Sequence, residues 1–415
     1  MDTITHSIVG ALSGKAFFAG TGVPAKSTPG SPPTANSSST ARVAILACTL
    51  GSVFPDIDVF AGPIAQNPLA MIEWHRNVTH SLVLLPVWAL LLAAMARPIA
   101  LRLGWASPSF ARLTGFIAFG LGTHLLLDVV TNFGTMLWSP VNYSRPALDW
   151  VFIVDLTVTA LALLPQLAEW CYREPDKFAR RGILVWGTLS VGTVGAYFLA
   201  DAVGFGFSPW VVGVVSTLMA FTIFAPSVRG AGFSWKRSTW NRAGVALLCF
   251  YFALAAAHHR MALALVEKYA ASNHWQVETL AALPLPPTLT HWSGLVSTPE
   301  GVWRTTFHLP AGQPESRVLY ADAQSSHLIE EAKRLHDVQI YLWFARFPLW
   351  RIQPQGDKTV VKVTDVRFFR DDSGDVIPQT RLTPGVRTNA AGFTFSIVFD
   401  AGGNVISHGM ERPEP

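Results

Sequence analysis

Long apolar runs are the feature that most constrains how this chain can fold. Several of them approach the roughly 20 residues that an α-helix needs to cross a bilayer. Irregular backbone and open sheet edges do not occur in contact with lipid, so runs of this kind favour helices. The chain is therefore predicted to be an α-helical polytopic membrane protein with about eight transmembrane helices. The apolar runs are residues 4–20, 41–54, 81–100, 113–133, 150–170, 183–200, 209–224 and 243–266.

The composition agrees with a membrane protein and excludes other classes. Charged residues make up only 14% of the 415 positions, against roughly 25% in soluble domains, and the mean hydropathy is +0.33. The net charge is +4 and the basic residues are scattered, so no nucleic-acid partner is expected. The 3 cysteines lie far apart in apolar runs, without the spacing of a zinc knuckle or a disulfide framework, and are expected to be core residues.

A change of character after about Tyr269 indicates two domains. Residues 1–268 carry the apolar runs, and residues 21–41 within them form a Pro/Ser-rich tract that we expect to be a flexible loop. Residues 269–415 are richer in proline and charge, so we expect a small, mostly antiparallel β domain with a short helix at residues 327–336. The expected strands lie in residues 301–309, 317–323, 338–347, 358–369 and 393–400, with turns at residues 371–375 and 400–404.

Basic residues fall in alternate loops between the apolar runs. Short loops rich in lysine and arginine stay in the cytoplasm. If the helices zigzag, all these loops are cytoplasmic together, and both termini lie outside. We therefore expect a multi-pass protein of the bacterial cytoplasmic membrane with an extracytoplasmic C-terminal domain. The basic residues are Lys15, Lys26, Arg42, Arg97, Arg102, Arg112, Arg173, Lys177, Arg180, Arg181, Arg229, Lys236, Arg237 and Arg242.

Histidines and aspartates from several separate stretches fall on the outer side of this arrangement. The strongest signal is in residues 120–134, where His124 and Asp128 interrupt an apolar helix and lie one turn apart on one face. Ionisable groups at that depth are costly and by default mark a functional site. The orientation rests on basic residues only, so this convergence supports it independently. The candidate ligands are His6, Asp56, Asp58, His75, His80, His124 and Asp128.

This set of side chains suits a divalent metal ion. Neutral imidazoles and carboxylates bind Zn, Mn or Fe, and the charge of the ion offsets the cost of keeping carboxylates in a partly dry site. A metal held in this way lowers the pKa of its bound water and makes it a nucleophile near neutral pH. We therefore expect zinc or manganese as the cofactor and hydrolysis as the simplest chemistry.

Individual members of the set also have simpler interpretations. Asp56 and Asp58 follow a proline and are typical of an Asx-capped turn. Arg76 is typical of a side chain that extends to the lipid head groups. Asp149 is interpreted as a charge at the boundary of the fifth helix, and Asp155, a turn and a half further on, is a candidate without an assigned role. The joint pattern favours a site more than any single residue does.

The motifs resemble those of a known bacterial family. THSIVGALSG near the N-terminus, PDID, HRxxTHS and GxxTHLLLDxxTNFGTxxxxP together resemble the YdjM/YbcI type of inner-membrane, metal-dependent hydrolase, also described as LexA-binding. The resemblance covers residues 2–140 closely and the later helices and outer domain loosely. Asn77 stands where the family usually has glycine, and the Pro/Ser-rich loop is unusual.

The resemblance implies a metal-dependent hydrolase in the cytoplasmic membrane, with the histidines and aspartates of these motifs as metal ligands. By position, the implied ligands are the seven residues named above, and Arg76, Thr79 and Thr131 are supporting polar groups. We assign catalytic roles to Arg76, Asp58 and Thr131, with Arg76 pairing with an anionic part of the substrate such as a phosphate.

Three functions compete on these grounds. The first is a hydrolase that binds one or two divalent metals and acts on a phospholipid, an isoprenoid-linked phosphate or another amphiphile, with membrane lipids as its surroundings. The second is a proton- or metal-coupled transporter in which His124 and Asp128 form a relay, although the two halves of the chain show no internal repeat of the kind common in transporters. The third is a non-enzymatic scaffold whose metal braces the helices.

Overall fold

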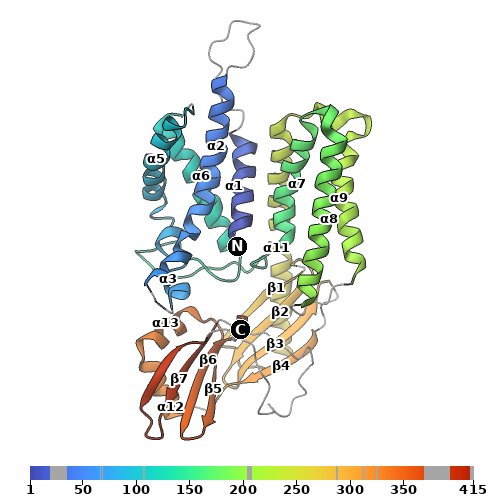
Figure 1. Cartoon of the computed structure of the whole chain (residues 1–415). Helices are drawn as coiled ribbons and strands as arrows, with labels where there is room; N and C mark the ends of the chain where they lie inside the picture. The colour runs from blue at the N-terminus through green and yellow to red at the C-terminus, as the bar shows by residue number, and fades with distance from the viewer. Residues whose placement is uncertain are drawn as a thin grey trace.

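The computed structural model consists of a helical bundle with two β-sheets at one end (Figure 1). It describes residues 1–18, 35–65, 67, 69–105, 108–202, 208–286, 288–310, 312, 314–323, 326–368 and 393–411.

Helices dominate the chain as far as Ser272. The α-helices are α1 (Thr3–Phe17), α2 (Ala35–Val53), α3 (Ala61–Ala65), α4 (Ala70–Glu73), α5 (Leu85–Arg102), α6 (Phe110–Val129), α7 (Leu156–Tyr172), α8 (Phe178–Ala202), α9 (Trp210–Phe224), α10 (Ala231–Ser234) and α11 (Arg237–Ser272). Short 3-10 helices join them at η1 (Phe54–Phe60), η2 (Val78–His80), η3 (Pro175–Lys177) and η4 (Ala225–Gly230).

Six helical segments in the described part of the chain are long and apolar enough to cross a membrane. They are Thr40–Phe60, Leu85–Arg102, Phe110–Val129, Pro175–Ala202, Trp210–Ser234 and Arg237–Ser272. Helices α1 and α7 pack beside them but have only 15 and 17 residues. The prediction of a polytopic helical membrane protein with a C-terminal β region is confirmed, while the count of eight spans stays a prediction.

The loop predicted at residues 21–41 is wrong at its C-terminal end. Helix α2 already begins at Ala35. The last proline before it is Pro33, so no residue that breaks a helix stands between Ala35 and the apolar run. The rest of the predicted loop lies outside the described residues.

Helices α1, α2 and α6 pack closely through small residues. A Cβ on Gly51 would lie 2.2 Å from the carbonyl oxygen of Ile117, and a Cβ on Gly120 would lie 2.1 Å from that of Cys48. Only glycine allows two helix backbones to approach in this way. The close packing brings the first turn of α1 and the C-terminal ends of α2 and α6 together at the end of the bundle that faces the sheets (Figure 1).

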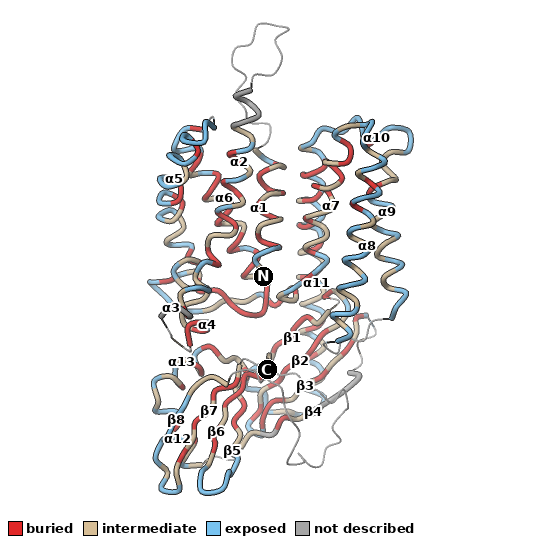
Figure 2. Tube along the Cα trace, in the orientation of Figure 1, coloured by how far each residue is buried: buried red, intermediate tan, exposed pale blue. Residues whose placement is uncertain are grey.

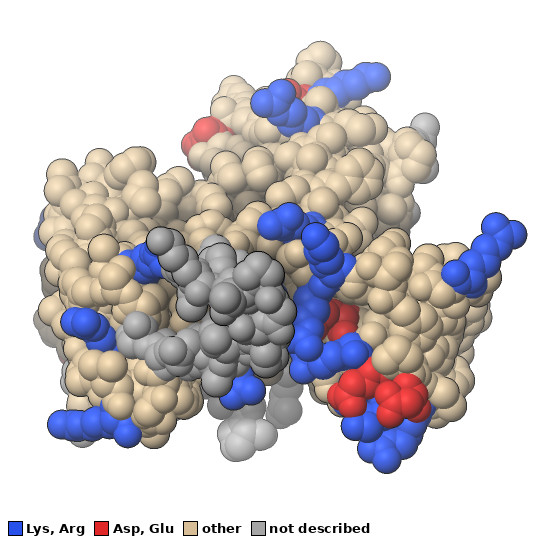
Figure 3. Space-filling view, turned by 90° about the horizontal axis from the view of Figure 1, so that it is seen from above, with Lys and Arg blue, Asp and Glu red and all other residues tan. Residues whose placement is uncertain are grey.

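The opposite end of the bundle is rich in basic side chains. Lysine and arginine outnumber acidic residues on this face (Figure 3). Lys15 lies in the last turn of α1 and Arg102 in the last turn of α5, while Arg237 begins α11. The basic end and the β-sheets therefore lie on opposite sides of the bundle.

Two four-stranded antiparallel sheets form the C-terminal part. The strands are β1 (Thr279–Leu285), β2 (His291–Thr298), β3 (Gly301–His308) and β4 (Pro314–Ala321) in the first sheet, and β5 (Pro348–Gln355), β6 (Lys358–Asp365), β7 (Thr394–Phe399) and β8 (Val405–Met410) in the second. Strands in each sheet pair in chain order. The predicted turn at residues 400–404 is confirmed by the hydrogen bond from the Asp400 amide to the Asn404 carbonyl, whereas residues 371–375 lie outside the described part.

Two helices, α12 (His327–Arg334) and α13 (His336–Phe344), connect the sheets. The helix expected at residues 327–336 is therefore confirmed as α12, but the strand predicted at residues 338–347 is wrong. Val338, Tyr341 and Phe344 recur every three residues and are all buried, which is the periodicity of a helix face. Helix α13 packs them against the second sheet.

Burial is uneven across the bundle. Figure 2 shows many buried positions in α1, α2, α6 and α7 and in the sheets, whereas α8 and α9 are mostly exposed or intermediate. One apolar cluster joins Leu69, Ile72 and Phe133 of the bundle to Tyr341 and Phe344 of α13. The C-terminal part is thus packed directly on the end of the bundle where α1, α2 and α6 meet.

Candidate metal centre

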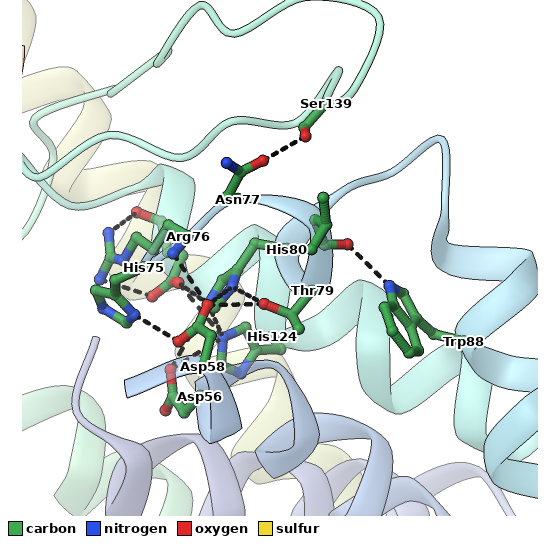
Figure 4. Close-up of polar contacts among 12 residues, drawn as sticks. Asp56, Asp58, His75, Arg76, Asn77, Thr79, His80, Trp88, His124 and Ser139 are labelled. Atoms are coloured by element: carbon green, nitrogen blue, oxygen red, sulfur yellow. Dashed lines mark hydrogen bonds and ion pairs between the residues drawn. The ribbon is translucent and has the colours of Figure 1, made fainter. Parts of the chain in front are cut away.

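Four segments from the N-terminal third of the chain meet at the end of the bundle that faces the C-terminal part. They are the first turns of α1, the 3-10 helix η1, the turn through η2 and the last turns of α6 (Figure 4). Local sequence explains their conformations: Asp2 caps α1 by accepting a hydrogen bond from the Thr5 amide, and Pro55 ends α2 and opens η1. All seven predicted ligands lie in this cluster.

Four donor atoms at the centre of the cluster converge on one point. The Nε2 atoms of His80 and His124 lie 3.0 Å apart. Asp128 Oδ2 is 3.2 and 3.3 Å from these two nitrogens, and Asp56 Oδ1 is 3.6 and 3.5 Å from them. Ligands of a tetrahedral metal with bonds of about 2.0–2.1 Å are about 3.3–3.4 Å apart. The spacing of the four atoms therefore fits a small divalent ion.

The hydrogen bonds of the two histidines leave both Nε2 atoms facing inward. The Nδ1–H of His124 donates to the carbonyl oxygen of Ser52 at 2.8 Å, and the Nδ1–H of His80 points to Asp58 Oδ2 at 3.1 Å. In a neutral imidazole this assignment places the lone pair on Nε2. Two lone pairs at 3.0 Å repel each other unless a cation lies between them.

In the absence of a metal, a proton provides that cation. Burial opposes protonation of His80, but hydrogen bonds with Asp128, Asp56 and Asp58 outweigh it and raise the pKa of His80 to about 10. While His80 Nε2 carries no proton, Asp128 Oδ2 is buried and lacks a hydrogen bond among the described residues. A buried acceptor without a donor is costly, so the same oxygen also favours a bound cation.

Asp58 has a different environment from Asp56 and Asp128. It accepts hydrogen bonds from His75 Nδ1 at 2.8 Å, from Thr79 Oγ1 at 2.7 Å and from the Arg76 amide at 3.1 Å, and it faces His80 Nδ1. These partners occupy both of its oxygens. Asp58 was predicted to be a metal ligand, but these contacts favour a role in orienting His75 and His80.

His6 completes the cluster from α1. Its Nε2 lies 3.2 Å from Asp128 Oδ1, and its ring stacks on that of His124 with the centroids 3.7 Å apart. Asp56 Oδ2 is held from the same helix by the Thr3 hydroxyl at 2.6 Å. Two overlapping groups of donor atoms, each within 4.8 Å of one another, have the spacing to hold an ion: His6, Asp56, His124 and Asp128, and Asp56, His75 and His80.

Arg76 and Thr131 support the aspartate at the centre. Arg76 is 2% exposed, and its Nη2 lies 2.9 Å from Asp128 Oδ1. Its Nη1 donates to Thr131 Oγ1 at 3.2 Å, and the Thr131 hydroxyl donates to the backbone carbonyl of Asp128 at 2.8 Å. The contacts of Thr131 therefore position Arg76 and the end of α6.

The turn around Asn77, which replaces the usual family glycine, does not need a glycine there. The left-handed backbone conformation falls on Arg76, whose φ is 63°, while Asn77 has a φ of −102°. The Asn77 side chain donates to the Glu73 carbonyl at 3.0 Å and accepts a short hydrogen bond from Ser139. A strained residue in the middle of a buried site is typical of functional sites.

Three further buried charged residues lie outside the cluster of predicted ligands. Asp149 is not a helix-boundary charge: it is buried, precedes α7 by several residues and pairs with Arg346 of the C-terminal part at 2.9 Å. Asp155 caps α7 and accepts a hydrogen bond from Tyr251 at 2.7 Å, which gives it a structural role. Arg145 is a further buried cation that the sequence patterns did not reveal; its one signal was a basic residue on the side predicted to lie outside.

Comparison with known proteins agrees with the family resemblance that the sequence motifs indicate. A family model described as YdjM inner membrane protein matches residues 1–262, which is more than half of the chain and includes every residue of the cluster. No curated protein and no solved structure matches the chain.

Proposed function

The chain belongs to the YdjM inner membrane protein family, and we propose that it is a metal-dependent hydrolase acting on a phosphoester or lipid-linked substrate at the outer face of the cytoplasmic membrane. The observation that carries the proposal is the pair of imidazole Nε2 atoms of His80 and His124, 3.0 Å apart and flanked by Asp56 and Asp128. Two nitrogens and two carboxylate oxygens suit zinc or manganese.

A bound divalent ion would activate a water molecule and stabilise negative charge on the substrate. The surrounding residues then have separate tasks. Asp58 holds His75 and His80 in the orientation that directs His80 Nε2 inward. Arg76 keeps Asp128 in place and offers its guanidinium to an anionic group of the substrate. Thr131 holds the Arg76 guanidinium in place by accepting a hydrogen bond from its Nη1.

The proposed side of the membrane follows from the distribution of charge. The basic end of the bundle lies opposite the sheets (Figure 3), and positively charged ends stay in the cytoplasm. The metal centre and the C-terminal part then face the extracytoplasmic side. Because the centre lies at the ends of membrane helices, an amphiphile whose apolar part stays in the bilayer is a better substrate than a soluble ester.

A metal-braced scaffold is the second candidate, and one observation favours it. His6, His80, His124 and Asp128 have no exposed surface, and Asp56 is only 8% exposed. Structural zinc sites are closed by four protein ligands, whereas catalytic sites keep an open position. In a scaffold, chelation lowers the melting temperature while no substrate is turned over.

The first experiment measures metal content by elemental analysis of the detergent-purified protein. Wild type is compared with His124→Ala and Asp128→Ala, and with His258→Ala on α11 as a matched control, because the His258 ring bonds the Leu254 carbonyl of its own helix. We expect stoichiometric metal in wild type and control and none in the two site variants.

Activity is then assayed on a short-chain phospholipid. Asp128→Ala is expected to reduce turnover by more than the about 10- to 100-fold that outer-shell substitutions cause. If wild type carries no metal even after reconstitution with zinc and manganese, the hydrolase proposal fails. If it binds metal but turns over no phosphoester, the scaffold is the better interpretation.

A further inference from the structure

A buried arginine lies between the metal centre and the C-terminal part. Arg145 belongs to the α6–α7 loop (residues 130–155), which crosses the end of the bundle that faces α13 (Figure 1). Its Nη1 donates to the Ile72 carbonyl at 2.6 Å and its Nη2 to the Gly134 carbonyl at 3.3 Å. Its Nε is buried and has no hydrogen-bond partner among the described residues.

The neighbouring arginines each pair with an aspartate, but Arg145 does not among the described residues. Arg76 pairs with Asp128, Arg346 with Asp149 and Arg367 with Asp365. Within the described part of the chain, by contrast, no ion pair is found for Arg145; two backbone carbonyls and aromatic rings surround it. A buried guanidinium without a carboxylate is costly. Burial, together with the charges of Arg76 and Arg367, lowers the pKa of Arg145 to about 9.

Arg145 is close to the metal centre. Its guanidinium carbon lies 5.2 Å from the centroid of the Phe133 ring, and that of Arg76 lies 4.9 Å from the same ring. The ring of His75 is also next to Phe133, with the centroids 5.9 Å apart. Both guanidinium groups therefore contact Phe133 at one edge of the cluster.

The C-terminal part supplies the other side of this arrangement. The guanidinium of Arg145 lies over Trp343 at 5.4 Å and over Phe344 at 5.1 Å from the ring centroids. Both aromatic residues belong to α13. Stacking of this kind orients a planar guanidinium and leaves its remaining donor free for a ligand.

With a divalent ion bound, the centre has an excess of positive charge. The ion and the guanidiniums of Arg76 and Arg145 together carry more charge than the carboxylates of Asp56, Asp58 and Asp128. An anion is therefore the ligand that this edge of the cluster favours. Arginine forks match the oxygens of a phosphate group in geometry as well as charge.

We propose that Arg145 and Arg76 form an anion subsite beside the metal centre that binds the phosphate group of the substrate, and that α13 of the C-terminal part completes it. This inference rests on the proposed function and names the group of the substrate that is recognised. The C-terminal part is then a component of the active site.

The test measures binding of inorganic phosphate and of short-chain phosphatidylglycerol to the full-length protein in detergent, with and without zinc, by isothermal titration. Arg145→Gln is expected to weaken binding by about tenfold or more while metal content is unchanged, since a hydrogen-bonded charge is lost. Arg346→Gln is the matched control, because it removes an arginine from the same boundary without touching the subsite, and its affinities should equal wild type.

Each outcome decides the proposal. Loss of affinity for both ligands, or for either one, supports the subsite and identifies lipid or free phosphate as the source of the anion. Unchanged affinity for both overturns it, as does loss of the metal together with the anion, which would make Arg145 a structural support. If Arg145→Gln does not fold, Arg145→Lys replaces it: a partial loss is expected, and wild-type affinity overturns the proposal. Arginine-dependent binding in a protein that never takes up metal would refute the hydrolase but keep the subsite.

Discussion

Buried carboxylates occur at both ends of the bundle, but their surroundings differ. At the basic end, Glu169 is 4% exposed and has Arg173 at 3.0 Å, Arg237 at 3.5 Å and Lys15 at 4.0 Å. These cations are 39%, 64% and 28% exposed, so their charges remain hydrated. At the candidate metal centre the carboxylates are instead surrounded by histidines, the buried Arg76 and the buried N-terminal amine of Met1, which pairs with Asp128.

The difference distinguishes a structural charge cluster from the proposed binding site. Glu169 is neutralised by its own neighbours and needs no further partner. At the other end, Asp128 keeps a buried oxygen without a hydrogen bond, and His80 and His124 direct their Nε2 atoms at each other. Burial alone therefore does not distinguish the two clusters; the convergent imidazole nitrogens do.

The largest effect is expected when a carboxylate is neutralised at each end. Asp56→Asn removes a charged ligand from the centre, so metal affinity should fall by about 100-fold or more, beyond the usual cost of an outer-shell change. Glu169→Gln should leave metal affinity unchanged and lower the free energy of unfolding by about 1–3 kcal/mol. Competition with a chelator and calorimetry measure the two quantities. Equal metal loss in both variants would contradict the distinction between the clusters.

A second, smaller effect is the dependence of metal affinity on pH. The pKa of His80 is raised to about 10, so over most of the accessible range a proton must leave before the metal binds. Apparent affinity should rise with pH by up to about tenfold per unit between about pH 6 and pH 9. Titrations at several pH values measure it, and the Glu169→Gln variant should show the same slope.

The metal-free protein should show the opposite trend in stability. A pKa raised from 6.5 means that protonated His80 stabilises the fold fully below about pH 6.5, and that this contribution is lost as pH rises through about 10. The melting temperature of metal-free protein should therefore fall over this range, while that of metal-loaded protein should not. A flat metal affinity together with a flat melting temperature would refute the role of His80.

The smallest effect is expected for an arginine at the basic end. Arg237 is 64% exposed, so Arg237→Gln should cost less than about 1 kcal/mol of stability. Arg76 is 2% exposed and paired with Asp128 at 2.9 Å, so Arg76→Gln should cost about 3–5 kcal/mol in metal-free protein. Chemical denaturation in detergent compares the two. Similar losses of stability in the two variants would contradict the view that only the Arg76 pair is shielded from solvent.

The helical part of the fold was predictable because length and apolarity are enough to define a membrane helix. The strands were harder to predict from the sequence. Strand β2 is buried at nearly every position, since Trp292 and Val296 pack against α11 and Leu295 packs against the second sheet. A strand covered on both faces has no alternating pattern. Helix α13 was misassigned because a short apolar run fits either period.

The residues that meet in the cluster were predictable, but their separate contacts were not. His124 and Asp128 share a helix, so their spacing revealed them. The carbonyl of Ser52, which orients His124, is a backbone group and leaves no trace in the residue types. Asp56 and Asp58 look equivalent in PDID, yet Asp56 faces the Nε2 atoms of two histidines, whereas Asp58 faces Nδ1 of His80 and of His75. Only the backbone of η1 distinguishes them.

Helix α11 has a mechanical consequence. Its 36 residues extend for about 54 Å without an internal proline, well beyond the roughly 30 Å of the hydrocarbon layer. Arg237 at one end lies beside Glu169, and Val266 and Ala270 near the other end belong to the core of the first sheet. Helix α11 is embedded in both parts and has no internal proline at which it could bend. A rotation of the sheets would therefore be transmitted along the helix to the opposite face of the membrane.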